Sequence, residues 1–324
     1  ISALEPKSWG DNLSVAISTN ADNASNYDIT IKYKSEDRET YENLSTDSTS
    51  DRFIEDIVNG DSKYITTEIV TDAGTLDSTD VGSTVDLTGG ADGISSLSDT
   101  DYTDALENLD NVNDLGLLVI PDSQAQSVVT GALAYCGNRG DLYFIADGEE
   151  TAENFDSAYG ELQYPWIKVA DPLSAGDKFV PTAGHVAGVK SRIDEERSVY
   201  KASAGTEATI FGALDVKVTI NDTLQNTLNP NNINVIRPIR NAGICVWGAR
   251  TLSSDPIDKY ENVRRGIIYL KKSITESMQW SVFEPNNADL WRKIRRSLNG
   301  FMEIEYDKGG FKGNVDEAFF VKCD

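Results

Sequence analysis

Runs of alternating apolar and polar residues mark the first 86 positions of the chain. Alternation places every second side chain on one face of a half-buried strand. The pattern predicts three strands, at residues 13–17, 27–33 and 63–70. The apolar residues of 51–58 fall on one helical face, whereas 35–50 is polar and predicts an exposed loop. We therefore expect residues 1–86 to form a small acidic β-rich domain, sandwich-like or barrel-like, with one helix.

The pattern changes after residue 86, where the glycine-rich stretch 88–93 marks a domain boundary. Beyond it, short apolar runs alternate with longer helical patterns. The predicted strands are 115–120, 142–145, 166–169, 233–237 and 243–247, and the predicted helices are 102–109, 121–136, 181–196, 259–278 and 288–299. Strands separated by helices favour a sheet with parallel neighbours and helices on its faces. We expect residues 87–324 to form a large mixed α/β core domain.

The charge is distributed unevenly along the chain. Its net value is −24, and residues 1–120 hold 25 acidic and 6 basic side chains, whereas residues 237–296 hold 12 basic and 6 acidic ones. The acidic excess argues against nucleic acid as a partner, because a DNA-binding face must be basic. Separate regions of opposite sign also suit a chain that binds copies of itself head to tail.

Cysteine usage and hydropathy exclude further classes. The three cysteines, Cys136, Cys245 and Cys323, are widely spaced and form no CxxC pair, so we predict reduced thiols and neither a disulfide framework nor a zinc site. No apolar run approaches the roughly 20 residues that a membrane helix needs. We expect a soluble protein without membrane insertion.

Motifs for catalysis or cofactor binding are missing from the sequence. The turn after residue 120 reads PDSQAQ, which lacks the glycines of a dinucleotide site, and no GxxxxGK[ST] or GxSxG string occurs. The single histidine, His185, is interpreted as a packed or capping residue. Residues 99–104 read DTDYTD, and we interpret these acids as a helix start and not as a cation site. We predict no catalytic, cofactor-binding or metal-binding residue, and no enzyme.

Specific motifs lie in the last third of the chain. Residues 246–252 read VWGARTL, followed by NVRR at 262–265 and VFEPN at 282–286, then Leu290 and Trp291. In this order they resemble the contractile tail sheath family of myophages, R-type tailocins and related injection systems. Residues 180–189, with Asp194 and 197–202, resemble the family's "VPPSG…AG…D…RGVWKAPAN" segment, although Ser198, Tyr200 and Ser203 differ from it. Residues 8–13 resemble the "GxWGN" entry to the family's β-rich insertion.

The resemblance implies a structural subunit of a virion tail. Such subunits polymerise helically around an inner tube and contract to drive the tube through the host envelope. The implied partners are neighbouring sheath subunits, the tube protein, and the baseplate and tail terminator proteins, with assembly in the host bacterial cytoplasm. The family's terminal arms, with "PGVYVEE"-like and "PxxPAEF"-like segments, have no counterpart here, so we expect a monomeric core fragment whose small domain is a surface-exposed insertion.

Two other classes remain open. The acidic domain is a candidate for an accessory receptor-binding role, which glycan or cell binding by residues 1–86 alone would reveal. An α/β enzyme without a recognisable motif would instead show a ligand-dependent rise in melting temperature.

The motif residues also have a physical interpretation. We expect Trp247 and Trp291 to pack into the core, Gly248 to permit a sharp turn, and Arg250 to bond carbonyls or a carboxylate. Residues 284–286 are predicted to form a strand-end turn. For six cations, a solvated helix face and an intersubunit contact are equally good interpretations: Arg264, Arg265, Arg292, Lys293, Arg295 and Arg296.

Overall fold

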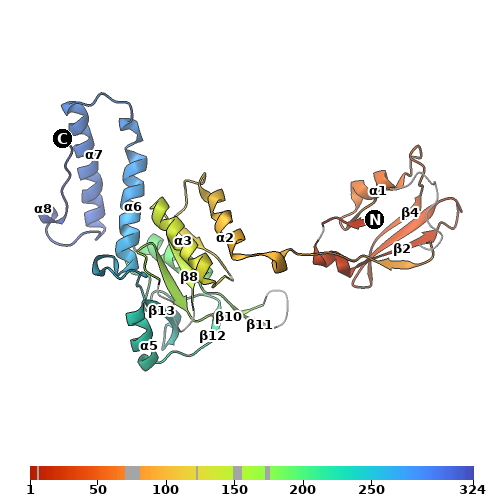
Figure 1. Ribbon diagram of the computed structural model, residues 1–324, viewed down its shortest axis with the longest axis horizontal. Coiled ribbons are helices and arrows are strands. Elements are labelled where there is room, and N and C mark those ends of the chain that lie inside the picture. Colours follow the sequence, from red (N-terminus) through yellow and green to blue (C-terminus); the bar gives the residue numbers. More distant parts are fainter. Residues whose placement is uncertain (6, 70–80, 122, 149–154, 172–175) are drawn as a thin grey trace. The chain divides into compact units, whose positions relative to one another are not determined.

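The computed structural model describes residues 1–5, 7–69, 81–121, 123–148, 155–171 and 176–324. These residues form two compact units, Ile1–Ser98 and Asp99–Asp324 (Figure 1). In the described part of the chain, no helix combines the length and the apolar content needed to cross a membrane.

The first unit is built on an antiparallel sheet of order β4-β3-β2-β6. Its strands are β2 (Leu13–Thr19), β3 (Tyr27–Tyr33), β4 (Glu36–Leu44) and β6 (Thr84–Asp86), and β1 (Ser2–Ala3) pairs separately with β5 (Ile65–Thr66). Alternate side chains of β2 and β3 are buried together with Ile54 and Val58 of α1 (Ile54–Asp61), as the alternation predicts. Two 3-10 helices, η1 (Ser8–Asn12) and η2 (Ile94–Ser96), complete the unit.

The predicted loop at residues 35–50 is wrong over most of its length, because β4 occupies Glu36–Leu44. Lys34 and Ser35 both have positive φ, at 50° and 68°, which suits a tight hairpin turn from β3 into β4. The strand lies at the sheet edge and buries only Tyr41 and Leu44, so its other side chains remain polar. The strand predicted at 63–70 is paired only at Ile65–Thr66, and residue 70 lies outside the described residues.

The second unit contains a five-stranded sheet of order β14-β13-β9-β8-β7. Its strands are β7 (Leu117–Val119), β8 (Tyr143–Asp147), β9 (Gly160–Tyr164), β13 (Ile233–Ile239) and β14 (Gly243–Val246). All neighbours are parallel except β13 and β14. The buried residues of α3 (Gln126–Arg139) and α4 (Ala183–Glu196) belong to two different core clusters, which confirms the predicted sheet flanked by helices.

A smaller sheet of order β11-β10-β12 accompanies the large one. Its strands are β10 (Ile167–Ala170), β11 (Asp177–Val180) and β12 (Ala213–Val216). The remaining short elements of the second unit are α2 (Asp99–Ala105), η3 (Leu106–Leu109), α5 (Asp222–Leu228), η4 (Asn229–Asn231), η5 (Pro256–Asp258), η6 (Gln279–Ser281) and α8 (Val315–Ala318).

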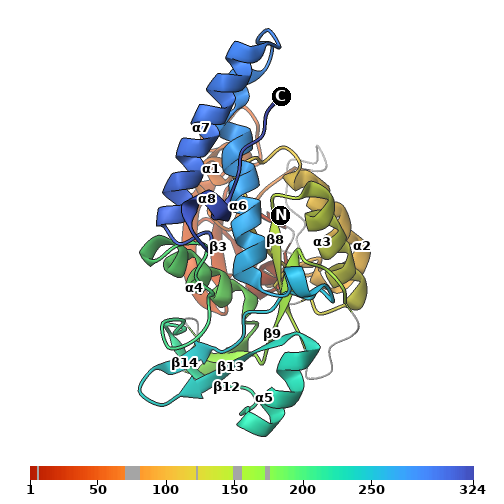
Figure 2. The same ribbon diagram turned by 90° about the vertical axis from the view of Figure 1, so that its left-hand side faces the viewer.

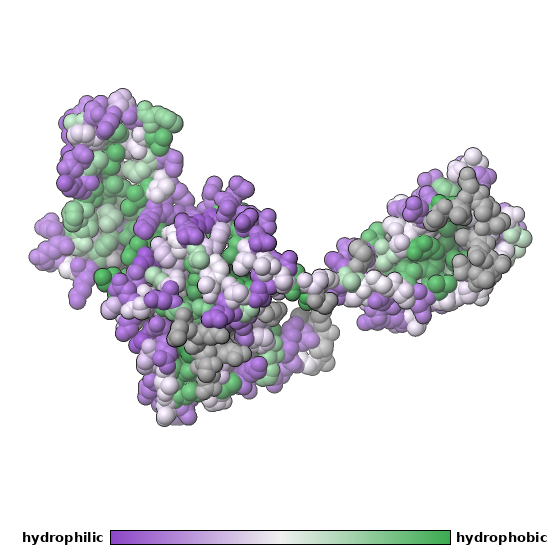
Figure 3. Space-filling view, in the orientation of Figure 1, coloured by the Kyte–Doolittle hydropathy of each residue, from purple (hydrophilic) through white to green (hydrophobic). Residues whose placement is uncertain are grey.

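Two long helices, α6 (Glu261–Ser277) and α7 (Ala288–Asp307), lie side by side as an antiparallel hairpin (Figures 1 and 2). Asn287 caps α7 by accepting the backbone N–H groups of Asp289 and Leu290 at 3.0 Å. Within α7 only Glu305 is buried, so the apolar side chains of this helix remain partly exposed (Figure 3). Residues 284–286 belong to the turn between these helices, so the predicted strand-end turn is wrong.

Candidate functional site

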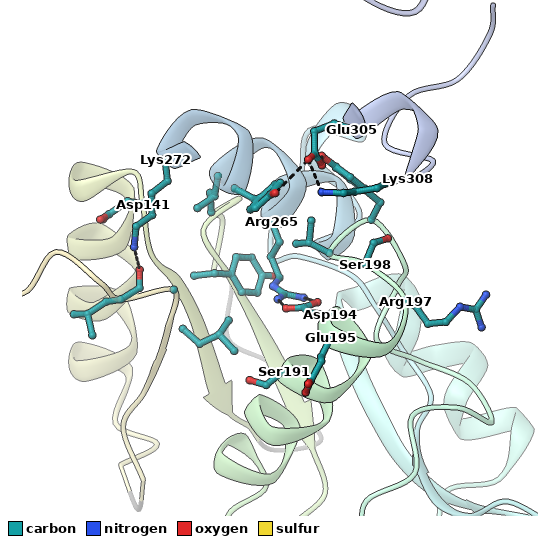
Figure 4. Close-up of a pocket in the computed structure, with 18 of the residues that line it drawn as sticks. Asp141, Ser191, Asp194, Glu195, Arg197, Ser198, Arg265, Lys272, Glu305 and Lys308 are labelled. Atoms are coloured by element: carbon teal, nitrogen blue, oxygen red, sulfur yellow. Dashed lines mark hydrogen bonds and ion pairs between the residues drawn. The ribbon is translucent and has the colours of Figure 1, made fainter. Parts of the chain in front are cut away.

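The base of the hairpin, where α6 and the end of α7 meet α4 and the sheet, encloses a cavity of about 700 Å³ (Figure 4). Apolar and aromatic side chains line it, among them Leu117, Tyr143 and Ile268. Five acidic and four basic residues also line it: Asp114, Asp141, Asp194, Glu195 and Glu305, with Arg197, Arg265, Lys272 and Lys308. Two contacts that connect the hairpin to the rest of the unit, a buried charge network and an aromatic clamp, lie beside this cavity.

The charge network centres on Lys190 of α4, whose side chain is 1% exposed. Its Nζ lies 3.1 Å from Oε1 of Glu161 on β9 and 3.2 Å from Oε2 of Glu261 at the start of α6. Both carboxylates are fully buried. One ammonium group therefore joins the central sheet, α4 and the first turn of α6.

Each carboxylate has further hydrogen-bond donors. Gln163 donates to Glu161 at 2.9 Å, and the hydroxyl of Tyr143 donates to it at 3.3 Å. The backbone N–H of Ser203 donates to Glu261 at 2.8 Å. Such saturation is the usual condition for keeping charge inside a protein.

Arg265 extends the network toward the cavity. Its guanidinium binds Asp194 of α4 through two nitrogens and lies 3.5 Å from Oε2 of Glu261, one helical turn earlier (Figure 4). A planar fork opposite a carboxylate fixes orientation as well as charge. Arg265 therefore sets the rotation of α6 against α4.

The two central carboxylates differ in proton affinity. Burial raises the pKa of Glu161 above its ordinary value, and the charge of Glu261 adds to this rise against the opposing effect of Lys190. Burial also acts to raise the pKa of Glu261, but Lys190 and Arg265 together outweigh it and lower that pKa. The difference follows from position, because Glu261 lies between two cations and Glu161 adjoins one.

The aromatic clamp holds the other end of the hairpin base. The hydroxyl of Tyr200 donates to Glu305 of α7 at 2.8 Å, and that of Tyr269 donates to the same carboxylate at 3.3 Å. The two rings meet edge to face, with centroids 6.4 Å apart. Burial raises the pKa of Tyr200, and the adjacent Glu305 raises it further, so the phenol stays protonated as a donor.

Two glycines make room for the Tyr200 ring. A Cβ atom on Gly266 of α6 would lie 3.0 Å from the ring, and one on Gly310, just after α7, would lie 2.7 Å from its Cζ. The backbone of both hairpin legs therefore approaches the ring more closely than any other residue would allow. The clamp ties α6, α7 and the segment around Tyr200 together.

The six cations singled out in the sequence fall into two groups. Arg264 pairs with Asp258 and lies over the ring of Tyr159, and Arg265 is buried and pairs with Asp194. For these two the interpretation as a solvated helix face is wrong, because each binds within the chain. Arg292, Lys293 and Arg296 are exposed on α7 and Arg295 is half-buried. Arg292 pairs with Asp289, whereas Lys293, Arg295 and Arg296 have no ion pair among the described residues.

The other singled-out residues are mostly structural. Trp247 is half-buried and packs against the core, as predicted. Trp291 is half-buried, with its indole N–H bonded to Asn286 at 2.7 Å. The backbone of Arg250 exchanges two 2.8 Å hydrogen bonds with the amide of Asn234.

At the remaining positions, the structure assigns local roles. A Cβ on Gly248 would meet Asn234 at 2.7 Å, so close packing requires a glycine there. His185 is half-buried in the first turn of α4, where Asp147 accepts the backbone N–H groups of Thr182 and Ala183 at 2.6 and 2.9 Å. Residues Asp99–Ala105 form α2, with two acids in its first turn, in line with the predicted helix start.

Sequence reasoning missed the network because β9 was not predicted. This strand reads GELQY, and its buried Glu161 and Gln163 look like loop residues in a hydropathy pattern. A polar run between two predicted strands of a parallel sheet was the available signal.

Comparison with known proteins gives the class of this fold. Residues 96–252 match the family model "Phage tail sheath protein central domain". The tail sheath protein of Burkholderia phage BcepMu is 25% identical over 216 residues, covering 63% of this chain and 43% of that protein. The PVC sheath complex of an extracellular contractile injection system, in its contracted state, aligns with a TM-score of 0.58 and 28% identity over 67% of this chain and 62% of that one.

A likeness in fold alone extends over both units. The sheath tail protein of Desulfitobacterium hafniense aligns with a TM-score of 0.64 over 97% of this chain and 71% of that one, at 13% identity. The curated relatives are longer, since this chain spans between 26% and 53% of their lengths. These comparisons support a contractile tail sheath family for the chain, with residues 96–252 as the part that matches the family's central domain.

Proposed function

We propose that this chain is the core of a structural subunit that polymerises helically around an inner tail tube and contracts to drive the tube through a cell envelope. The match of residues 96–252 to the sheath central domain carries this proposal. The partners are neighbouring copies, the tube protein, the baseplate and the tail terminator. The assembled product belongs to a virion tail and forms in the host cytoplasm.

The geometry of the second unit suits this role. A contractile lattice rearranges contacts between subunits while each subunit moves largely as a rigid body. The charge network and the clamp fix the hairpin to the sheet through buried side chains, so a load on the hairpin is transmitted to the whole unit. The cations of α7 that have no ion pair among the described residues are the part of the hairpin available to an acidic surface on an adjacent copy.

The small acidic unit is proposed as an appendage on the outer face of the sheath. It has its own buried core, formed by β2, β3, β4 and α1, and residues 1–120 hold 25 acidic against 6 basic side chains. This independence also favours a second candidate role, the binding of an external surface. Glycan or cell binding by residues 1–98 would support that role.

Negative-stain electron microscopy tests the proposal directly. The chain, and a form extended at both ends by arm segments of a homologous sheath, are each imaged alone and with purified tube protein. Hollow striated tubes from the extended form are the expected result. Dispersed particles from the extended form even with tube protein present would overturn the sheath function.

A further inference from the structure

An exposed apolar tip closes the hairpin, and the subunit's own packing does not account for it. Trp280, Val282 and Phe283 form the tip between α6 and α7, with exposed fractions of 43%, 53% and 101%. Phe283 lies within the VFEPN motif. Asn286 of this motif accepts the indole N–H of Trp291, whereas the ring of Phe283 is fully exposed. Figure 3 shows apolar surface along this part of the hairpin.

The backbone at the tip is strained in a way that presents the ring. Phe283 has a φ of 69°, in the left-handed region that a bulky side chain rarely adopts. A small residue would fit this conformation at lower cost. A strained, fully exposed aromatic residue next to two other exposed apolar side chains is typical of a docking element.

The same chain offers a receptor for this tip. The cavity at the base of the hairpin is lined by Leu117, Val199 and Ile268 and by the rings of Tyr143, Tyr200 and Tyr269. Its volume of about 700 Å³ exceeds that of one aromatic side chain. Tip and cavity lie on different parts of one unit, so a contact between them would join two copies of the chain.

The segment around the tip has more basic than acidic side chains, and the cavity lining has one more acidic than basic side chain. Residues 280–296 carry four basic and two acidic side chains. The cavity lining carries five acidic and four basic ones. Each of the four lining cations is already paired: Arg197 with Glu207, Arg265 with Asp194, Lys272 with Asp114 and Lys308 with Glu305. Among the lining acids, Asp141 is also paired, with Arg139, whereas Glu195 is exposed and has no ion pair among the described residues.

We propose that the hairpin tip, centred on Phe283, inserts into the cavity at the base of the hairpin of a neighbouring copy of the same chain. Contact between two different patches of identical subunits is heterologous, and it propagates into rings or open helices instead of closing as a dimer. The inference rests on the proposed sheath function and names which surfaces meet. It also assigns a role to the VFEPN motif, namely presentation of the ring.

Photo-crosslinking tests the contact. A benzophenone analogue of phenylalanine replaces Phe283 in the extended form, tubes are assembled and irradiated, and adducts are mapped by mass spectrometry. Intersubunit adducts within residues 114–117 or 191–200 are the expected result. Adducts only to the tube protein, to another part of the neighbouring copy, or to nothing while tubes still form would overturn the inference and leave the sheath function standing. If neither this variant nor the unmodified extended form makes tubes, both fall.

A matched pair of variants measures the contribution of the ring. Phe283→Gly removes the side chain and suits the left-handed backbone, so its thermal stability should equal or exceed that of the wild type. We expect at least a tenfold rise in the subunit concentration needed for tube formation. Ile257→Ala, at a residue 76% exposed on η5, is the control and should assemble like the wild type. Equal assembly of all three proteins would overturn the inference.

Discussion

The base of the α6–α7 hairpin and the outer surface of α7 carry the same kinds of side chain in opposite circumstances. At the base, Lys190 and Arg265 are buried and bonded to Glu161, Glu261 and Asp194. On α7, Lys293 and Arg296 are exposed and have no ion pair among the described residues. Charge density along the sequence does not separate Arg265 from Lys293 and Arg296, because all three lie in the basic stretch 237–296.

This difference indicates that the buried charges stabilise the fold, whereas the exposed charges of α7 are available for contacts with other subunits. A buried ion is costly unless partners surround it, so removing one partner leaves the others uncompensated. An exposed ion is already solvated, and its loss alters stability little. Four sets of substitutions probe the hairpin base and α7, in order of decreasing expected effect on stability.

Lys190→Met removes the ammonium that Glu161 and Glu261 share while keeping most of the side-chain volume. We expect the free energy of unfolding to fall by about 3–5 kcal/mol, because two buried carboxylates lose their common partner. Urea denaturation of this variant beside Lys293→Met measures the contrast. The exposed control should stay within about 0.5 kcal/mol of the wild type. Equal effects of both variants would contradict the assignment of Lys190 as the centre of the network.

Gly310→Ala tests the clamp. The added methyl group would lie 2.7 Å from Cζ of Tyr200 and 2.9 Å from the carbonyl oxygen of Glu305, so the ring or the helix end must move. We expect a loss of about 1–3 kcal/mol, as for other overpacked sites. Gly300→Ala is the matched control, since a Cβ there meets nothing within 4 Å, and within α7 it should stabilise by about 0.5–1 kcal/mol. Thermal unfolding that ranks the two variants in the reverse order would refute the clamp.

Glu161→Gln and Glu261→Gln should show opposite pH dependence. The pKa of Glu161 is raised in the folded state, so its stabilising contribution is present below the ordinary glutamate pKa of about 4.3 and is lost as pH rises through the raised value. The pKa of Glu261 is lowered, so its contribution is present above about 4.3 and is lost as pH falls through the lowered value.

Relative to the wild type, Glu161→Gln should therefore become less destabilising as pH rises. Glu261→Gln should become more destabilising as pH rises. Urea titrations across the acidic range measure both slopes. Parallel slopes for the two variants would show that the carboxylates share one environment, against the geometry.

The sequence allowed the architecture to be predicted better than the site. Alternation and apolar runs located β2, β3 and the parallel strands β7, β8 and β13, whose apolar side chains pack into the cores. Apolar residues at helical spacing located both hairpin helices. They missed β9, whose Glu161 and Gln163 are buried only because Lys190 and Tyr143, distant in sequence, supply partners. They also missed β4, an edge strand with a polar outer face. Long-range pairing of polar groups leaves no periodic pattern, so the network could not be predicted.

Charge reversal on α7 has the smallest expected effect on stability and separates the exposed cations from the buried ones. Arg295→Glu with Arg296→Glu removes no ion pair among the described residues, so unfolding should shift by no more than about 0.5–1 kcal/mol. If these cations face an acidic patch on an adjacent copy, tube assembly of the extended form should fail, because like charges then meet at the contact.

Lysine at both positions is the matched control, since it keeps the charge and should retain assembly. Normal tubes from the glutamate variant would refute the proposed contact while leaving the fold assignment intact. Lost assembly at unchanged stability would separate the two groups of cations experimentally, with the buried ones serving the fold and the exposed ones serving assembly.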